Sequence, residues 1–403
     1  MGQVGTEATL LNILEKCTQI EGYVDVIANG YDVHDWGGIK ILVNNLTAEH
    51  EYPVGSQVLD TWAKNADTSY QTAWDVVDYD DDKNMYLKWH YGLPDSIQFD
   101  APEAIYYAGS EGLAAGTYHI EIGSAYGDGW STSKSIQFTL QNALPAGGQI
   151  YINCGTNNAN DPTNSRTGYT YSSGNSTTAI ETFTTSNGTG GTSLGTIGNE
   201  SAQKQNGNLN AISRVVYGSG RWSQSAIRQY LNSTADAGAW WTAQNGWDRP
   251  PAQHTTLRGF LAGCPSDFVN ILEEVEVVTA LNTVEGYTDA SEITHDKIFL
   301  PSLQQMYINP QLANVEGEDW DYYKDLAAEA GLTGKFQQYG TYPILKTYSV
   351  ASKTSAVSVW LRSASRGNAN YAWYVDSGGT VDSHYGAYGS LSGCPACIIK
   401  KSQ

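Results

Sequence analysis

Two cysteines near the C-terminus have a spacing that is often associated with chemistry. Cys394-Pro-Ala-Cys397 matches the C-x-x-C pattern of redox and zinc motifs. No βαβ pattern surrounds the pair and the sequence has no second C-x-x-C, so we favour buried structural cysteines over an oxidase centre. The chain has five cysteines at irregular spacing, which does not form a disulfide framework.

Other chemical motifs are weak or absent. Asp80-Asp81-Asp82 could bind calcium, but it lacks the residue order of an EF-hand loop, so we favour a solvated turn. The seven histidines are scattered, and the sequence contains no H-x-x-x-H, G-x-S-x-G or P-loop motif. We therefore expect no catalytic residue, no metal site and no cofactor, and we do not expect an enzyme.

The stretch from Val359 to Lys400 has the composition of a binding surface. Tyr, Asn, Asp, Ser, His and Gly fill a frame of strand formers and anchors. Tyr gives a large amphipathic contact area, while Ser, Gly and Asn adapt their hydrogen bonds. The expected frame residues are Trp360, Leu361, Trp373, Val375, Val381, Ile398 and Ile399. The expected ligand-binding residues are Asn368, Asn370, Tyr371, Tyr374, Asp376, Gly378, Asp382, Ser383, His384, Tyr385, Tyr388 and Ser390.

The residue types between the frame positions also fit a particular codon origin. Between Gly367 and Gly393 there is no Lys, Glu, Gln or Met. A codon AAC or AAT mutated at its adenines yields Asn, Tyr, Asp, His, Ser or Gly but none of those four residues. This pattern is expected of a diversity-generating retroelement target, in which adenine-directed mutation rewrites a receptor-contacting face. The alternative is a Gly-rich hairpin region with polar turns, which needs only turn chemistry.

Composition limits the fold and the partners. The 403 residues include 42 Gly, 27 Tyr and 12 Trp, and only 16% are charged, which favours a protein rich in strands and loops. The net charge of −20 argues against binding to nucleic acid or to anionic lipid. We find no signal peptide and no apolar run of membrane-spanning length. We therefore expect synthesis in the cytoplasm and no membrane insertion.

The elements that must position these residues fall into three expected parts. Residues 1–51 begin with a helix over Thr6–Ile20, whose apolar face serves either oligomerisation or packing on its own domain. Residues 52–145 contain short alternating runs separated by turns, which predict an antiparallel β-sandwich-like domain. Residues 146–403, after Pro145-Ala146-Gly147-Gly148, mix helices, long loops and closing strands. The expected fold class is α+β.

Several motifs carry a resemblance to known families. The segment from about 208 to 400 resembles a domain of unknown function found in gut Firmicutes and their phages. The motifs are Arg221–Arg228, Asp248–Pro251, Thr279–Thr283, Phe299–Ser302, Val359–Ser363 and Pro395–Cys397. Tyr52–Ser56 and Gln98–Ala104 resemble the β domain that accompanies it in phage-encoded proteins. The last strands are similar to a C-type-lectin-like domain of retroelement-diversified tropism determinants, although Ser392–Ala396 departs from the usual closing pattern.

The resemblance implies a phage virion protein, a tail or head fibre component, that displays a hypervariable face to a host-surface protein or glycan. Other virion proteins and further copies of the chain are expected partners, and a trimer is one possible assembly. Two alternatives stay open. One is an architectural capsid or tail component, and the other is an enzyme, because formylglycine-generating enzymes share the C-type-lectin-like architecture.

Overall fold

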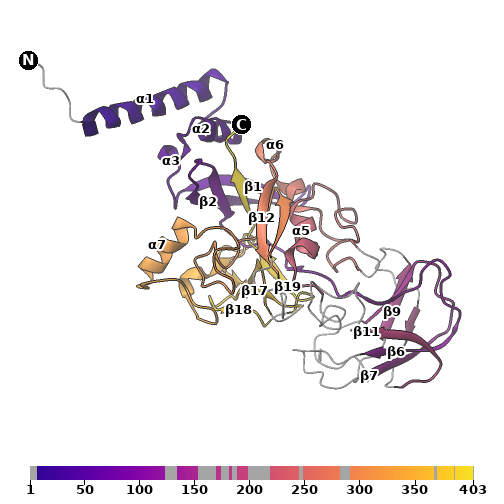
Figure 1. Ribbon diagram of the computed structural model, residues 1–403. Coiled ribbons are helices and arrows are strands. Elements are labelled where there is room, and N and C mark those ends of the chain that lie inside the picture. Colours follow the sequence, from indigo (N-terminus) through magenta and orange to yellow (C-terminus); the bar gives the residue numbers. More distant parts are fainter. Residues whose placement is uncertain are drawn as a thin grey trace, which may run out of the picture.

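The computed structural model describes residues 7–122, 134–152, 169–173, 181–183, 188–197, 218–244, 248–281, 291–366, 370–384 and 386–402. Its helices and its antiparallel and mixed strands confirm the α+β class (Figure 1). The helices are α1 (Glu7–Ala28), α2 (Trp36–Asn44), α3 (Ala48–Glu51), α5 (Ala226–Leu231), α6 (Ser266–Ile271) and α7 (Asp321–Glu329), with 3-10 turns η2 (Trp222–Gln224), η3 (Phe260–Gly263) and η4 (Pro343–Leu345). None of the helices in these ranges is long and apolar enough to cross a bilayer.

One sheet joins the two ends of the sequence. Its strand order is β1 (Gln57–Ala63), β2 (Ser69–Tyr79), β3 (Met85–Trp89) and β20 (Ala396–Ile399), and every pairing is antiparallel. Ala396, Cys397 and Ile399 are buried, as expected for an apolar strand that the rest of the fold covers. The last strand of the chain therefore depends on a strand more than 300 residues earlier.

A second sheet carries the C-terminal stretch. Its order is β18 (Val381–Asp382), β17 (Ala372–Val375), β16 (Val359–Ala364), β19 (Ser390–Gly393) and β4 (Ile97–Gln98). β16 and β19 run parallel, and the other pairs are antiparallel. Every residue of β16 is buried, as expected of a central strand covered on both faces. The short pairs β12 (Val275–Ala280) with β13 (Ser291–Asp296) and β14 (Thr347–Tyr348) with β15 (Ala356–Val357) flank this region.

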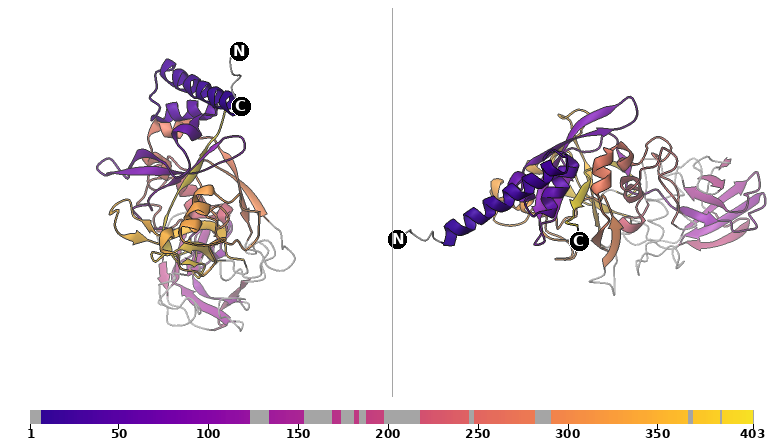
Figure 2. Two further views of the ribbon diagram at one scale, coloured as in Figure 1. Left: turned by 90° about the vertical axis from the view of Figure 1, so that its left-hand side faces the viewer. Right: turned by 90° about the horizontal axis from the view of Figure 1, so that it is seen from above.

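The described residues between 104 and 197 form a separate β unit inserted between the strands of the main body. One sheet has the order β10 (Glu181–Phe183), β9 (Tyr169–Ser173), β8 (Gly148–Ile152), β5 (Ala104–Tyr107). The other has the order β11 (Thr192–Ile197), β6 (Gly116–Ile122), β7 (Lys134–Leu140). Its buried residues, such as Ile120, Ile136 and Phe138, lie outside the main hydrophobic cluster. Figures 1 and 2 show these strands at the end of the molecule far from α1.

This arrangement corrects the expected domain boundaries. A boundary between 145 and 146 would separate β5 from β8, which pair directly. A domain of residues 52–145 would separate β3 from β20 and β4 from β19. The strands expected in this segment all exist as β1–β7, but they belong to two different bodies. Alternation within a strand predicts the strand and one buried face, and it does not identify the partner strand.

Besides the expected helix, the first 51 residues contain a second helix that is part of the main core. Trp36, Ile39 and Leu42 of α2 are buried in the main core, and the ring of Trp36 lies 4.5 Å from that of Phe268 on α6. The first helix extends to Ala28, eight residues past the expected end at Ile20. The first helix α1 projects from the body, as the right-hand view of Figure 2 shows.

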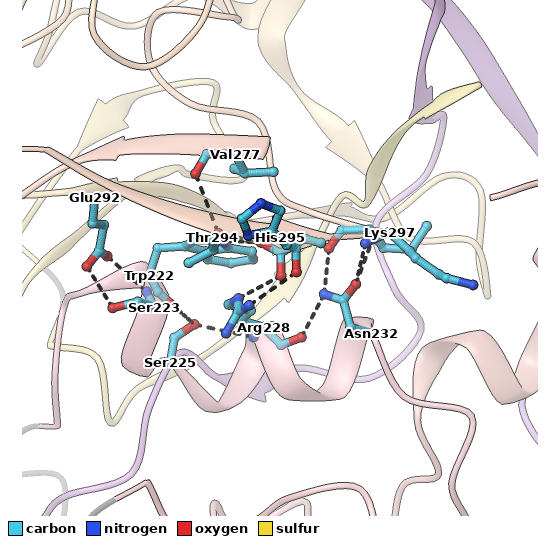
Figure 3. Close-up of polar contacts among 12 residues, drawn as sticks. Trp222, Ser223, Ser225, Arg228, Asn232, Val277, Glu292, Thr294, His295 and Lys297 are labelled. Carbon is cyan, nitrogen blue, oxygen red and sulfur yellow. Dashed lines mark hydrogen bonds and ion pairs between the residues drawn. The ribbon is translucent and has the colours of Figure 1, made fainter. Parts of the chain in front are cut away.

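The motif Arg221–Arg228 fixes α5 to β13 through one buried carboxylate (Figure 3). Asp296, 1% exposed, accepts hydrogen bonds from Trp222 Nε1 at 3.1 Å and from Thr294 Oγ1 at 2.6 Å. Arg228 Nε contacts its other oxygen at 2.6 Å. Ser225 caps α5 by accepting from the backbone N–H of Arg228. The polar residues of the motif therefore pair with each other and with β13.

A second contact in Figure 3 closes the other end of α5. Asn232 Oδ1 accepts from the backbone N–H groups of Lys297 at 2.8 Å and Ile298 at 3.0 Å. Its Nδ2 donates to the carbonyl oxygen of Ile298 at 2.7 Å. The helix is held at its start by the Asp296 carboxylate of β13 and at its end by Asn232, which satisfies backbone groups just after β13. These pairings explain why polar residues are tolerated in this interior.

Candidate ligand-binding site

The frame of the candidate site is buried largely as expected. Trp360 and Trp373 are fully buried, and Leu361, Val375 and Val381 are buried with them. The indole N–H of Trp360 donates to the carbonyl oxygen of Ile97 at 3.1 Å, and that of Trp373 donates to Gln311 Oε1 at 3.0 Å. The expectation that Ile398 is buried is wrong, because it is half-buried and Ile399 occupies the buried position of β20.

The side chain of Arg362, a residue of β16, holds several loops together. This guanidinium is 1% exposed and donates to the carbonyl oxygens of Leu300 at 2.9 Å and Glu316 at 2.7 Å. Ser363 Oγ donates to the Glu316 carboxylate at 2.6 Å. Burial lowers the pKa of Arg362 to about 10 and raises that of Glu316, even though the two opposite charges offset part of this effect. The Trp-Leu-Arg-Ser motif therefore builds the scaffold under the site.

Five side chains are linked by contacts around β17 and β18, and we call this group the tyrosine face: Tyr339, Tyr371, Tyr374, Asp382 and His384. The ring of His384 lies 5.3 Å from that of Tyr339 and 6.5 Å from that of Tyr371. Tyr374 lies opposite Asp382 in the β17–β18 pair, and its hydroxyl donates to Asp382 Oδ2 at 3.2 Å. Such a group offers aromatic surfaces, hydroxyls and one carboxylate together.

Asp382 is the polar centre of the tyrosine face. Partial burial raises the pKa of its carboxyl, but donors outweigh this effect and the net pKa is lowered. The donors are the backbone N–H groups of His384 and Ser383, at 3.0 and 2.6 Å, and the ring Nδ1 of His384 at 2.7 Å. The side chain of Asp382 is 28% exposed and that of His384 is 68% exposed. Both remain accessible to a ligand.

Several expected binding residues have other places in the structure. Asn370 and Ser383 are 3% and 2% exposed, so the expectation that they contact a ligand is wrong. The backbone N–H of Ala387 donates to the carbonyl oxygen of Asn370, which covers Asn370 with the following segment. Ser383 Oγ is 3.1 Å from the hydroxyl of Tyr339. Asn368 and Tyr385 lie outside the described residues.

The remaining expected residues lie either in a turn or at the start of β19. Asp376 Oδ1 accepts from the backbone N–H groups of Gly378 and Thr380, both at 2.7 Å, and organises a turn in which Gly379 has φ +88°. Tyr388 and Ser390 are half-buried at the start of β19, where the Tyr388 carbonyl oxygen accepts from Gln98 Nε2 at 2.7 Å. The tyrosine face therefore contains four of the twelve expected residues: Tyr371, Tyr374, Asp382 and His384.

Tyr339 belongs to the tyrosine face although sequence analysis did not select it. It is 54% exposed, and its ring lies 5.3 Å from that of the buried Trp373. Its backbone N–H donates to the carbonyl oxygen of Val381 at 2.8 Å, which places it beside β18. The segment Gln338-Tyr339-Gly340-Thr341-Tyr342 shares the Tyr, Gly and Thr composition of the C-terminal stretch. That shared composition was the available signal.

The C-x-x-C pair lies inside the fold. Cys394 and Cys397 are buried and unbridged, which agrees with the structural role favoured from sequence. Cys394 Sγ donates to the carbonyl oxygen of Trp89 at 2.8 Å. Burial raises the pKa of both thiols, so the reactive thiolate is disfavoured.

An acidic hollow beside β2 is the other notable depression. It encloses about 360 Å³, and its lining includes Asp78, Asp80, Glu318 and Trp320. Burial raises the pKa of Asp78 to about 6. Asp80 accepts two hydrogen bonds from Asn84, and Asp81 and Asp82 are exposed, in keeping with the solvated turn favoured from sequence. Across the described ranges, no three His, Cys, Asp or Glu residues are grouped to hold a metal ion.

Residues 199–401 match the family described as Domain of unknown function (DUF6273), and the chain belongs to this family. The match covers half of the chain and includes all six C-terminal motifs. No match was found among curated proteins or among solved structures. Strands β3 and β4 lie outside the matched segment and still complete its two sheets. In this chain the family domain is therefore not structurally self-contained.

Proposed function

We propose that the protein is a phage virion adhesion protein, a tail or head fibre component, whose tyrosine face binds a host-surface protein or glycan. The observation that carries the proposal is the collection of accessible Tyr, His and Asp side chains over a frame of buried tryptophans. Interface anchors are enriched in Tyr and gain affinity when the surface beneath them is rigid. The proposal includes location in the virion and contacts with other virion proteins.

The adenine pattern supports a face that is rewritten by a diversity-generating retroelement. Tyr371, Tyr374, Asp382 and His384 can all be reached from AAC or AAT codons by changes at adenine. The frame residues Trp360 and Trp373 cannot be reached in this way, and both are fully buried. Asn370 and Ser383 are also reachable but are buried. The four reachable residues of the tyrosine face remain accessible above the two buried tryptophans, so this part of the surface can vary without loss of the fold.

The finer fold assignment is part of the same proposal. We propose a C-type-lectin-like arrangement for the region that carries the second sheet, in which the last strands display the variable residues. The sandwich-like part then corresponds to the two sheets of β5–β11. This assignment rests on the position of the tyrosine face at the C-terminal strands and on the sequence resemblance.

Two other classes of function make different demands. An architectural virion component needs no accessible binding face, and it would tolerate changes across Tyr339, Tyr371 and His384. An enzyme on this fold with Cys394 and Cys397 at its centre requires reactive thiols, whereas both thiols are buried with raised pKa values. A reverse transcriptase gene beside an A-rich template repeat near this gene would favour the diversified binding protein.

A binding experiment tests the proposal directly. Fluorescently labelled protein is applied to a glycan array and to a panel of gut bacterial cells, and Tyr339→Ala and Tyr371→Ala are compared with the unchanged protein. We expect each variant to lose about five- to 150-fold in affinity, equivalent to roughly 1–3 kcal/mol. The matched control is Tyr348→Ala, since Tyr348 is 41% exposed on β14, outside the tyrosine face. Equal binding by all variants would refute the role of this face.

A further inference from the structure

Helix α1 has two faces with opposite environments. Gly22 and Val26 are buried against the body, and a Cβ at Gly22 would lie 2.6 Å from Thr47 Oγ1. Tyr23 is half-buried, and its hydroxyl donates to the carboxylate of Glu51 on α3. These residues form the face through which α1 attaches to its own chain. The attachment needs no other part of the helix surface.

The other face of α1 is apolar and uncovered. Ile20, Val24 and Ile27 are 61, 57 and 72% exposed, and Cys17 is also exposed. Leu14, 64% exposed, lies beside them. These exposed fractions show that no other described part of the chain covers this face, and Figure 1 shows the N-terminal part of α1 extending away from the body. A continuous apolar stripe of this kind marks an interaction surface.

The spacing of the stripe identifies its partner. Cys17, Ile20, Val24 and Ile27 follow each other at intervals of three, four and three residues, and the sequence repeats this spacing upstream at Leu10 and Ile13. Apolar residues at alternating intervals of three and four define the a and d positions of a coiled coil. Packing on a globular domain needs a broader stripe and is already provided by the Gly22–Val26 face. The regular seam therefore fits other helices of the same kind.

The residue types indicate how many helices meet and in which direction. The d positions are Ile13, Ile20 and Ile27, and the a positions are Leu10, Cys17 and Val24. Ile at d favours three or four strands over two, because β-branched d residues pack poorly in a parallel dimer. Lys16 falls at position g and Glu21 at the following e position, and both are exposed. These two positions face each other between neighbouring helices only when the helices are parallel and in register.

We propose that α1 is the assembly element of the protein and joins three copies of this chain in a parallel, in-register coiled coil through the seam of Cys17, Ile20, Val24 and Ile27. The three bodies attach to the outside of the bundle through the Gly22–Val26 face. This inference rests on the helix alone and is independent of what the tyrosine face binds. A trimer would nevertheless present three tyrosine faces to one host surface, which raises avidity without any new contact.

The first test measures the mass of the full-length protein in solution by light scattering and sedimentation. We expect the unchanged protein to have the mass of three chains and the double variant Ile20→Asp, Ile27→Asp to have the mass of one. The control Thr18→Asp adds one such charge at an exposed position outside the seam and should remain a trimer. Circular dichroism and thermal melts verify that the bodies stay folded. An unchanged protein that is monomeric, dimeric or tetrameric, or a double variant that is trimeric, would overturn the proposal.

The second test addresses direction and register through the charge pair. Lys16→Glu and Glu21→Lys each place like charges across three interfaces, and we expect each to weaken trimer association by about tenfold at low salt. Combining the two substitutions reverses each pair and should restore association to near the original strength. Equal weakening in the double variant would show that the residues do not face each other and would refute the parallel register.

Discussion

Two aspartates, one inside the main body and one on the tyrosine face, each collect hydrogen bonds from three groups. Asp296 is 1% exposed and pairs with Arg228, Trp222 and Thr294. Asp382, whose side chain is 28% exposed, accepts from His384, Ser383 and Tyr374. The donors are comparable in number, but the first set is enclosed and the second lies open to solvent.

The difference in burial determines what each group contributes. When an enclosed carboxylate is removed, the charged and polar groups that it paired with stay buried and water cannot reach them. Such a network therefore contributes strongly to the stability of the fold. A carboxylate at the surface exchanges its partners for water at small cost, so its network can orient side chains and still release them to a ligand. The same chemistry thus supports structure in one region and recognition in the other. Four predictions test this division, beginning with the largest effect.

The largest expected effect concerns the frame beneath the tyrosine face. Trp373→Ala removes a fully buried indole, and we expect a loss of about 3–5 kcal/mol in the free energy of unfolding. Urea denaturation measures this loss. His384→Ala is the control from the exposed layer and should cost no more than about 0.5 kcal/mol. Similar losses in both variants would remove the distinction between frame and face.

The buried carboxylate should give the next largest effect. Asp296→Ala leaves the indole N–H of Trp222 and the hydroxyl of Thr294 without their acceptor and removes the partner of Arg228. We expect a loss of about 3 kcal/mol, because the Arg228 side chain is 25% exposed and water can solvate part of its charge. The loss is measured by thermal and urea denaturation. A change below about 1 kcal/mol would show that the network in Figure 3 is not needed for stability.

The third prediction concerns the hydroxyl of Tyr374 on the tyrosine face. Tyr374→Phe removes the hydroxyl that donates to Asp382 and retains the ring, which lies 6.1 Å from that of Trp360. We expect a change in stability of no more than about 0.5–1.5 kcal/mol and a clear loss of cell or glycan binding. Melting curves and the binding assay are run on the same sample. A large loss of stability with unchanged binding would assign Tyr374 to the frame.

The smallest effect depends on pH. Because the folded pKa of Asp382 is lowered, its contribution to stability is present above the unfolded pKa of about 4 and disappears as the pH falls through the folded value. The unchanged protein should therefore exceed Asp382→Asn in stability at neutral pH by less than about 1 kcal/mol, and this difference should vanish in acid. Melts between pH 7 and 2 measure it.

Asp78 provides a control of opposite sign for the pH experiment. Burial raises its pKa to about 6, so the folded state holds its proton more tightly and stability falls as the pH rises from about 4 through 6. Asp78→Asn should therefore be more stable than the unchanged protein at pH 7 and equal to it near pH 4. If the effects of Asp78→Asn and Asp382→Asn on stability changed in the same direction with pH, the environments assigned to the two carboxyl groups would be wrong.

The sequence by itself determined the local elements and the layering of the C-terminal stretch. The strands expected between residues 52 and 140 all form, because alternation of apolar and polar residues acts within a few residues. Trp360, Trp373 and Val375 are buried as their types predict. The solvated turn at Asp80–Asp82 and the burial of Cys394 and Cys397 also agree with the sequence, and turn chemistry depends on nearby residues.

Only the tertiary structure decided which strands pair and which polar residues stay accessible. β20 pairs with β3 and β19 with β4, so the unit of residues 104–197 is an insertion and the expected boundary at 145 does not exist. Asn370 and Ser383 have the same polar character as Asp382, yet neighbouring segments cover them. Tyr339 joins the face from a loop more than 30 residues before Tyr371. Burial and pairing depend on contacts between distant segments, and a periodic pattern within one segment does not specify the other.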